Sequence, residues 1–213
     1  MNYKDIKVVF IDWYGTLSVT KFWHQLENPK HPHHLYWEII EAEMTDQKQQ
    51  FLDPWMRGQI NTEDVVRRIA KATNLSYSIL FDEFVKSAET LSVIPGALPL
   101  IHQIRSKGIH VAIATDNMDS FYRWTVPSLN LKLKFDSILN SAVSRVLKRD
   151  CSDSGQNIFF SRFMRERDVL AHECLLIDDS ASLEPVIRSV DMQFVPIPFG
   201  EGLIPVLNEL LVE

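Results

Sequence analysis

Five short apolar runs, spread along the whole chain, constrain the fold more than any other feature of the sequence. The runs at 7–11, 109–114 and 175–177 lack a regular apolar–polar alternation, and each is followed by a polar or acidic residue. Short runs of this kind are typical of strands that are buried on both faces, as in a parallel sheet. The five runs cover residues 7–11, 109–114, 137–139, 175–177 and 193–195.

Helical patterns lie between most of these runs. Residues 96–107 place Leu100, Ile101 and Ile104 on one side, and Gly108 follows as a stop signal. Apolar residues repeat at helical spacing again over 158–164 and 186–190. Strands that alternate with helices predict an α/β fold with an open parallel sheet and right-handed crossovers.

The segment from residue 19 to about 91 separates the first two runs and contains helix patterns without a convincing strand. Residues 61–64, Asn-Thr-Glu-Asp, form a good helix start before an apolar helical face. An insertion of about 70 residues is too long for a structureless loop. We therefore expect a core domain of residues 1–18 and 92–213, with a helical cap domain of residues 19–91 inserted after the first strand.

Composition narrows the class of protein. Hydrophobic residues make up 46% and charged residues 23% of the chain, as in globular proteins. The net charge of −6 has the opposite sign to that of proteins that wrap phosphate backbones, so we expect no nucleic-acid partner. Cys151 and Cys174 form no pairing or metal motif, the N-terminus lacks a signal-type stretch, and no segment approaches the ~18 apolar residues of a membrane span. We expect a cytoplasmic protein without a membrane partner; nothing in the sequence specifies an oligomeric state.

Polar side chains follow three of the predicted strands, at Asp12, at Thr115 and at the pair Asp178 and Asp179. Ligands of open α/β sheets bind beyond the carboxyl ends of the strands, so these residues could form one site. Asp12 is a candidate nucleophile, because carboxylates form aspartyl-phosphate intermediates. Clustered carboxylates repel one another, and Mg²⁺ between Asp12 and Asp178 would remove that cost. The Thr115 hydroxyl and the Lys148 charge suit a transferring phosphoryl group.

The same positions resemble the four motifs of the haloacid dehalogenase (HAD) superfamily, in the order of that family. Residues 11–17, Ile-Asp-Trp-Tyr-Gly-Thr-Leu, resemble the first motif, and Thr115 after an apolar strand resembles the second. Phe135–Asp136 followed by Lys148 resembles the third, and residues 176–180, Leu-Ile-Asp-Asp-Ser, resemble the acidic fourth. The helical insertion after the first motif is similar to the branch with an α-helical cap. The resemblance implies a Rossmann-like core and a hydrolase that acts on a small molecule, such as a phosphate ester or another small acid.

The resemblance also implies roles for single residues. The implied metal ligands are Asp12, the backbone carbonyl of Tyr14, and Asp178, with Asp179 supporting the Mg²⁺ ion. The implied catalytic residues are Asp12, Thr115 and Lys148. The expected substrate-binding residues are Thr115, Asp116 and Lys148.

The chain departs from the family pattern at three positions. Tyr14 stands where phosphatases of the family carry a second Asp as general acid and base, and a phenol is a poor base at neutral pH. Arg149 replaces the Pro that usually follows the lysine, and Leu183 replaces an Asn of the fourth motif. We therefore expect a Mg²⁺-dependent phosphohydrolase with weak turnover, biased to leaving groups of low pKa.

Two alternatives stay open. Asp-x-Tyr-Gly-Thr also resembles 2-haloacid dehalogenases, which need no metal, lack the paired acids and bind the halide with an Arg of the cap. At the comparable place this chain has Trp37–Glu38, and the nearest later arginine is Arg57. The other alternative is a catalytically silent protein that keeps the metal and phosphate site.

A histidine cluster stands in the expected cap, at His31, His33 and His34. Histidines at such spacing can bind Zn²⁺, but no acidic or Cys residue is spaced to complete a site. We interpret the cluster as part of a polar loop.

Overall fold

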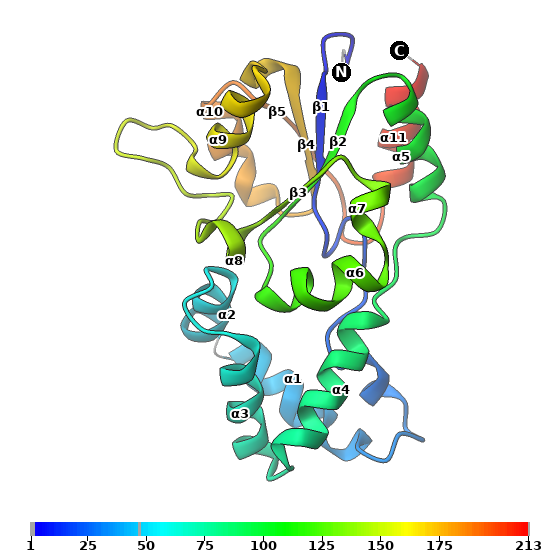
Figure 1. The fold of residues 1–213 in the computed structure, drawn as a ribbon, viewed down its shortest axis with the longest axis vertical. Coiled ribbons are helices and arrows are strands. Elements are labelled where there is room, and N and C mark those ends of the chain that lie inside the picture. Colours follow the sequence, from blue (N-terminus) through cyan, green and yellow to red (C-terminus); the bar gives the residue numbers. More distant parts are fainter. Residues whose placement is uncertain (1–2, 47, 213) are drawn as a thin grey trace.

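A five-stranded parallel sheet forms the centre of the fold in the computed structural model, which describes residues 3–46 and 48–212 (Figure 1). The strand order is β3-β2-β1-β4-β5. All five predicted apolar runs are strands, which confirms the α/β fold class with an open parallel sheet. The strands are β1 (Val8–Ile11), β2 (His110–Thr115), β3 (Ser137–Asn140), β4 (Cys174–Asp178) and β5 (Gln193–Pro196).

Both faces of the sheet are covered by helices. Along β1, Val9 and Ile11 belong to one apolar cluster and Val8 and Phe10 to another, so successive side chains point into different cores. Helices α5 and α11 lie on the first face, and α9 and α10 lie on the second (Figure 1). This two-sided burial is the reason why the strands do not alternate between apolar and polar residues. The helices of this part are α5 (Ala97–Ser106), α6 (Val126–Ser128), α7 (Leu131–Lys134), α8 (Ser141–Ser144), α9 (Ile158–Arg167), α10 (Glu184–Ser189) and α11 (Leu203–Val212).

The described part of residues 19–91 is helical and contains no strand. The predicted helix start at residues 61–64 is confirmed: the Asn61 side chain accepts from the backbone of Asp64, and the Asp64 side chain accepts in return from the backbone of Asn61. The helices are α1 (Trp37–Asp46), α2 (Lys48–Met56), α3 (Thr62–Thr73) and α4 (Tyr77–Glu89). They contribute most of a third apolar cluster, which includes Trp23, Trp55 and Phe84 and also Met118 from the segment after β2.

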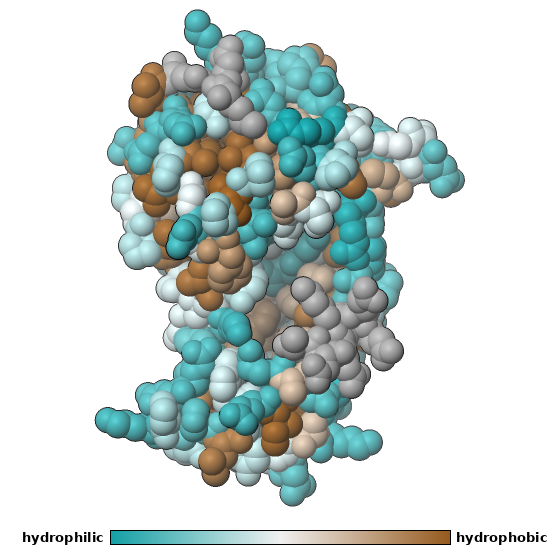
Figure 2. Space-filling view, turned by 180° about the vertical axis from the view of Figure 1, so that it is seen from behind, coloured by the Kyte–Doolittle hydropathy of each residue, from teal (hydrophilic) through white to brown (hydrophobic). Residues whose placement is uncertain are grey.

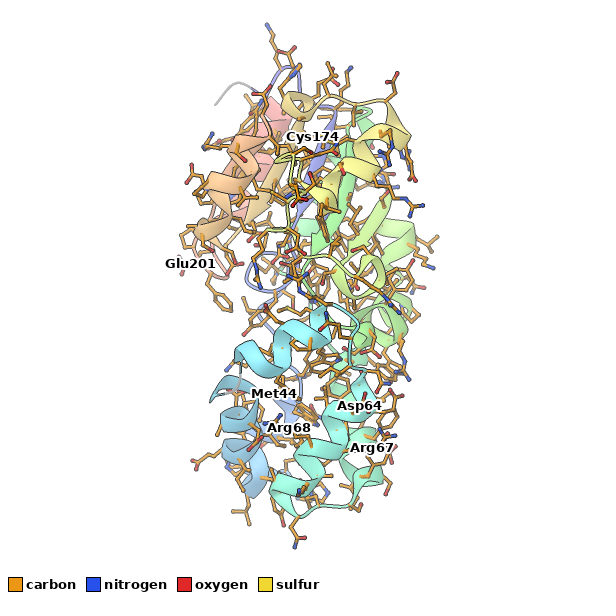
Figure 3. The ribbon with its side chains drawn as sticks, turned by 90° about the vertical axis from the view of Figure 1, so that its left-hand side faces the viewer. Met44, Asp64, Arg67, Arg68, Cys174 and Glu201 are labelled. Atoms are coloured by element: carbon orange, nitrogen blue, oxygen red, sulfur yellow. The ribbon has the colours of Figure 1, made fainter. Side chains whose placement is uncertain are left out.

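The helical part lies beyond one end of the sheet, along the long axis of the molecule (Figure 1). Cys174, the first residue of β4, lies at the opposite end (Figure 3). Because the strands are parallel, their carboxyl ends therefore all point toward the helical part. Residues after those carboxyl ends lie between the sheet and the helices α1–α4.

The surface mixes polar and apolar side chains. Apolar residues gather in separate groups on the face seen in Figure 2, with hydrophilic residues between them. Among the described residues, no helix combines the length and the apolar character needed to cross a lipid bilayer.

Burial raises the pKa of the Cys174 thiol to about 12, so this residue behaves as a small apolar side chain of the core.

Candidate active site

Asp12 and Asp178 lie side by side at the carboxyl edge of the sheet. The parallel register pairs Ile11 with Ile177, so the residues that come next, Asp12 and Asp178, lie at the same level of the sheet. The backbone N–H of Asp12 continues the ladder and donates to the Ile177 carbonyl at 3.0 Å. Both carboxylates are buried. The strand pairing itself therefore brings together two acids that are 166 positions apart (178 − 12).

Lys148 lies between these two acids. Its Nζ donates to Asp12 Oδ1 at 2.8 Å and to Asp178 Oδ2 at 2.5 Å, and the whole residue is buried. Two polar contacts fix the backbone of Lys148. Its N–H donates to Asp116 Oδ1 at 2.9 Å, and its carbonyl accepts from Asn157 Nδ2 at 2.7 Å. Asp116, expected to bind substrate, thus holds the segment that carries the lysine.

Thr115 is the last residue of β2 and is fully buried. In the sheet order, β2 and β4 flank β1, so Thr115 and Asp178 lie on opposite sides of Asp12. Thr115 is thus brought to the same edge of the sheet as the acids, as the sequence predicts.

Asp179 completes an acidic trio. One carboxylate oxygen from each of Asp12, Asp178 and Asp179 lies within 4.8 Å of the other two. Among the residues that the structure describes, no other group of three or more His, Cys, Asp or Glu side chains is placed to share an ion in this way. Gly15, in the turn after β1, lies directly against the Asp179 carboxylate.

Tyr14 projects from the turn after β1 and is 40% exposed. Its ring makes an edge-to-face contact with Phe199, at 5.3 Å between ring centroids. Burial, with smaller contributions from Glu41 and Asp179, raises the pKa of the Tyr14 phenol above its ordinary value of 10. The phenol therefore stays protonated at neutral pH and cannot serve as a general base.

The site carries more negative than positive charge. Burial raises the pKa of Asp12 to about 7; Lys148 opposes this shift and Asp178 adds to it. Burial also raises the pKa values of Asp116 and Asp179, again with a contribution from Asp178. Although burial opposes it, the surrounding carboxylates hold the pKa of Lys148 well above its usual range. One ammonium group therefore faces several carboxylates that it does not fully neutralise.

These residues fit a magnesium ion. Mg²⁺ prefers oxygen ligands, and the acidic trio offers only oxygens. Lys148 uses one oxygen of Asp12 and one of Asp178, and the second Asp178 oxygen accepts from the Ser180 N–H at 2.8 Å. A divalent cation would balance the negative charge that Lys148 leaves unpaired.

The histidine cluster makes its contacts within the helical part. His31 Nδ1 accepts from the His33 N–H at 3.1 Å, and its Nε2 lies 3.4 Å from a Glu83 carboxylate oxygen. His34 Nδ1 lies 2.7 Å from the Leu26 carbonyl. Glu83 is an acidic neighbour that the local spacing did not reveal, because it comes from α4.

Sequence reasoning singled out Asp116 but missed Asn157, which also holds Lys148 in place. Asn157 both caps α9, by accepting from the Phe160 N–H at 3.1 Å, and donates to the Lys148 carbonyl. An Asn immediately before a helical pattern is a recognisable cap signal, so this residue could have been found. Arg57, the arginine nearest to the place of a halide-binding residue, donates two hydrogen bonds to Asp150 instead.

Solved structures of several other proteins share this fold. The fold is similar to a predicted HAD-like family hydrolase from Porphyromonas gingivalis (18% identity, 98% of each chain, TM-score 0.69). It is also similar to a HAD family enzyme from Bacteroides thetaiotaomicron in complex with magnesium and inorganic phosphate (14% identity, 94% of this chain and 98% of that chain, TM-score 0.68). A third similar structure is the L-2-haloacid dehalogenase from Xanthobacter autotrophicus (15% identity, 90% of this chain and 77% of that chain, TM-score 0.63). A search of the curated proteins found no significant match.

At these identities the structural likeness shows the fold alone. The family model of haloacid dehalogenase-like hydrolases matches residues 6–184, which include all four motifs and the helical insertion. The chain therefore belongs to the haloacid dehalogenase-like hydrolases.

Proposed function

We propose that this hydrolase is a Mg²⁺-dependent phosphohydrolase that acts on a small phosphorylated metabolite. The observation that carries the proposal is the acidic trio of Asp12, Asp178 and Asp179, whose negative charge exceeds what Lys148 offsets. Such an excess suits a divalent cation, and a site with a cation, a lysine and a poised carboxylate suits phosphoryl transfer. The structural likeness to a HAD family enzyme in complex with magnesium and inorganic phosphate agrees with this proposal.

Asp12 is the proposed nucleophile. Its carboxylate oxygen bonds to phosphorus while the bond from phosphorus to the leaving oxygen breaks. Water then attacks the aspartyl-phosphate, releases inorganic phosphate and regenerates Asp12. Lys148 and the Thr115 hydroxyl would hold the phosphoryl oxygens, and Asp12, the backbone carbonyl of Tyr14 and Asp178 would hold the ion, with Asp179 supporting it. When bound, Mg²⁺ supplies charge that stabilises the transferring group.

Tyr14 makes the proposed reaction selective. The missing general acid leaves the departing oxygen without a positioned proton donor, and general acid–base help typically contributes about 10²–10⁴-fold to a rate. Alkoxide leaving groups need that proton, whereas the phenolate of an aryl phosphate and the carboxylate of an acyl phosphate leave as stable anions. We therefore propose slow turnover that favours leaving groups of low pKa.

A substrate panel tests the proposal. Aryl, acyl and alkyl phosphates are incubated with the enzyme in Mg²⁺ and in EDTA, and phosphate release is measured beside an Asp12→Asn control. We expect release from aryl and acyl phosphates, lost in EDTA and in the variant. Release that survives EDTA, or that Asp12→Asn does not reduce, would contradict the mechanism.

A 2-haloacid dehalogenase is the second candidate, favoured by Tyr14 in the first motif and by the likeness to the Xanthobacter enzyme. It predicts halide release from a 2-haloacid in EDTA. The pairing of Arg57 with Asp150 weighs against it, because the guanidinium group is already bound. Binding of Mg²⁺ and inorganic phosphate without any product would instead indicate a catalytically silent protein.

The helices α1–α4 form most of an apolar cluster that is distinct from the two clusters on the faces of the sheet, which supports our division of the chain. We propose that residues 19–91 act as a cap domain over a core of residues 1–18 and 92–213, and that the enzyme works in the cytoplasm.

A further inference from the structure

Two ion pairs join the loop after Lys148 to the helical part; the arginine lies in the helical part in one pair and on the loop in the other. Arg57, directly after α2, donates from Nη1 to Asp150 Oδ2 at 2.5 Å and from Nη2 to Asp150 Oδ1 at 2.9 Å. Arg149 on the loop donates in the reverse direction, to Asp53 of α2. The two-bond Arg57 pair is the less exposed, with side chains 25% and 21% exposed, against 49% and 30% for the other. Two-bond pairs of arginine and carboxylate combine strength with a fixed geometry.

The carboxylate of Asp150 also holds the backbone next to the lysine. Its Oδ2 accepts from the Leu147 N–H at 2.8 Å, so one oxygen binds both Arg57 and the residue before Lys148. Although burial opposes it, the hydrogen bonds from Arg57 lower the pKa of Asp150, which keeps the pair ionised at neutral pH.

The two backbones approach closely at the same place. A Cβ added to Gly58, the residue after Arg57, would lie 2.5 Å from the Ala142 carbonyl oxygen of α8. Side-chain and backbone contacts therefore fix the end of α2 against the segment that leads to Lys148.

We propose that Arg57 is a positioning residue: through Asp150 and the Leu147 amide it sets the place of the Lys148 ammonium between Asp12 and Asp178. The position of the helical part is thereby linked to the position of the charge that meets the phosphoryl group. The role of Lys148 in this inference rests on the proposed phosphohydrolase function. A misplacement of about 1 Å can cost up to about 10²-fold in rate, so a loosened turn lowers kcat more than it raises KM.

The test compares Arg57→Met with Glu63→Met as a matched control. Glu63 makes another two-bond pair between the helical part and the core, with Arg123 at 2.7 and 3.0 Å, but that pair does not contact the turn at residues 147–150. Both substitutions remove one charge and keep an unbranched stem. We expect Arg57→Met to lower kcat about tenfold with less than about a threefold change in KM, and Glu63→Met to leave kcat within about twofold of the unmodified enzyme.

Hydrogen exchange at the Leu147 amide, followed by NMR, gives a readout that does not depend on turnover. We expect faster exchange in Arg57→Met and no change in Glu63→Met. Asp150→Asn keeps an acceptor for the Leu147 N–H but weakens the pair, and adding Arg57→Met to it should lower kcat little further, because both act through one contact.

Equal loss of kcat in both methionine variants would overturn the inference, since Arg57 would then act only by attaching the cap. Unchanged exchange at Leu147 in Arg57→Met would also overturn it. If the unmodified enzyme hydrolyses no phosphate ester, the proposed function fails, while the exchange measurement still decides whether Arg57 fixes the turn.

Discussion

Gly15 and Asp179 are in direct contact: a Cβ built on Gly15 would lie 2.4 Å from the Cγ of Asp179. The backbone of Gly15 has φ +92°, in the left-handed region that favours glycine. The turn after β1 thus packs against Asp179, the residue that follows β4 and the third member of the acidic trio. The contacting atoms of Asp179 are the end of its side chain, so a larger residue at position 15 would displace the carboxylate rather than the backbone.

Gly15→Ala should therefore lower the affinity for Mg²⁺ in addition to lowering the stability of the fold. Gly108 has a similar φ of +87° with no atom within 4 Å of an added Cβ, which makes Gly108→Ala a matched control. Both variants should lose about 1–2 kcal/mol of stability in chemical denaturation, from the backbone conformation alone. Only Gly15→Ala should bind Mg²⁺ more weakly by calorimetry. Equal magnesium affinity in the two variants would mean that the Asp179 carboxylate is not needed for the ion.

Tyr14→Asp should increase the hydrolysis of alkyl phosphates. The new carboxyl group would supply the missing proton donor, and we expect a rise in kcat/KM of about tenfold or more, at the low end of general acid–base effects. Tyr14→Phe keeps the ring contact with Phe199 and removes only the hydroxyl. This control should leave the alkyl rate unchanged. A marked loss in Tyr14→Phe would show instead that the phenol already donates the proton.

Lys148→Met should destabilise the protein strongly in EDTA and less in Mg²⁺. Removal of the ammonium leaves Asp12 and Asp178 buried without their partner, and breaking a buried ion pair typically costs about 3–5 kcal/mol. A bound cation offsets part of that repulsion, so added Mg²⁺ should raise the melting temperature of the variant more than that of the unmodified protein. Asp178→Asn together with Lys148→Met removes one of the unpaired charges and should recover stability in EDTA. Equal melting temperatures with and without Mg²⁺ would argue against an ion beside these acids.

The sequence predicts the sheet well because its strands are buried on both faces. The strand at 8–11 begins one residue later than its predicted run, and the strands at 110–115 and 174–178 differ from theirs by one residue at each end. At the carboxyl ends the reason is that Thr115 and Asp178 are buried polar residues, which an apolar pattern leaves out. The placement of Asp12 and Asp178 at the same edge of the sheet also follows from parallel strands, and the pairing of β1 with β4 makes them neighbours. These parts of the structure depend on local pattern and on a general rule about sheet edges.

The placement of Lys148 and its neighbours could not be predicted in the same way. The lysine lies on a loop, and its position depends on Asp116, Asn157 and the Arg57–Asp150 pair. Arg57 and Asp150 are 93 positions apart and share no periodic pattern. Such contacts arise only when the inserted helices pack against the core, so a single sequence gives no local signal for them.

Magnesium affinity should fall as the pH falls below about 7. Burial and the Asp178 charge raise the pKa of Asp12 to about 7, and burial raises the pKa of Asp179 as well. These carboxyl groups hold protons below their raised pKa values and must release them to bind the ion, so protons compete with the metal. Above pH 7 the affinity should level off, and below it each pH unit should weaken binding by up to about tenfold if one proton is released.

Calorimetry in two buffers of different ionisation enthalpy measures the proton release directly. Asp12→Asn cannot bind the competing proton, so its weaker magnesium binding should depend less on pH. An unmodified protein with the same affinity at pH 5.5 and pH 8 would contradict this account of the site.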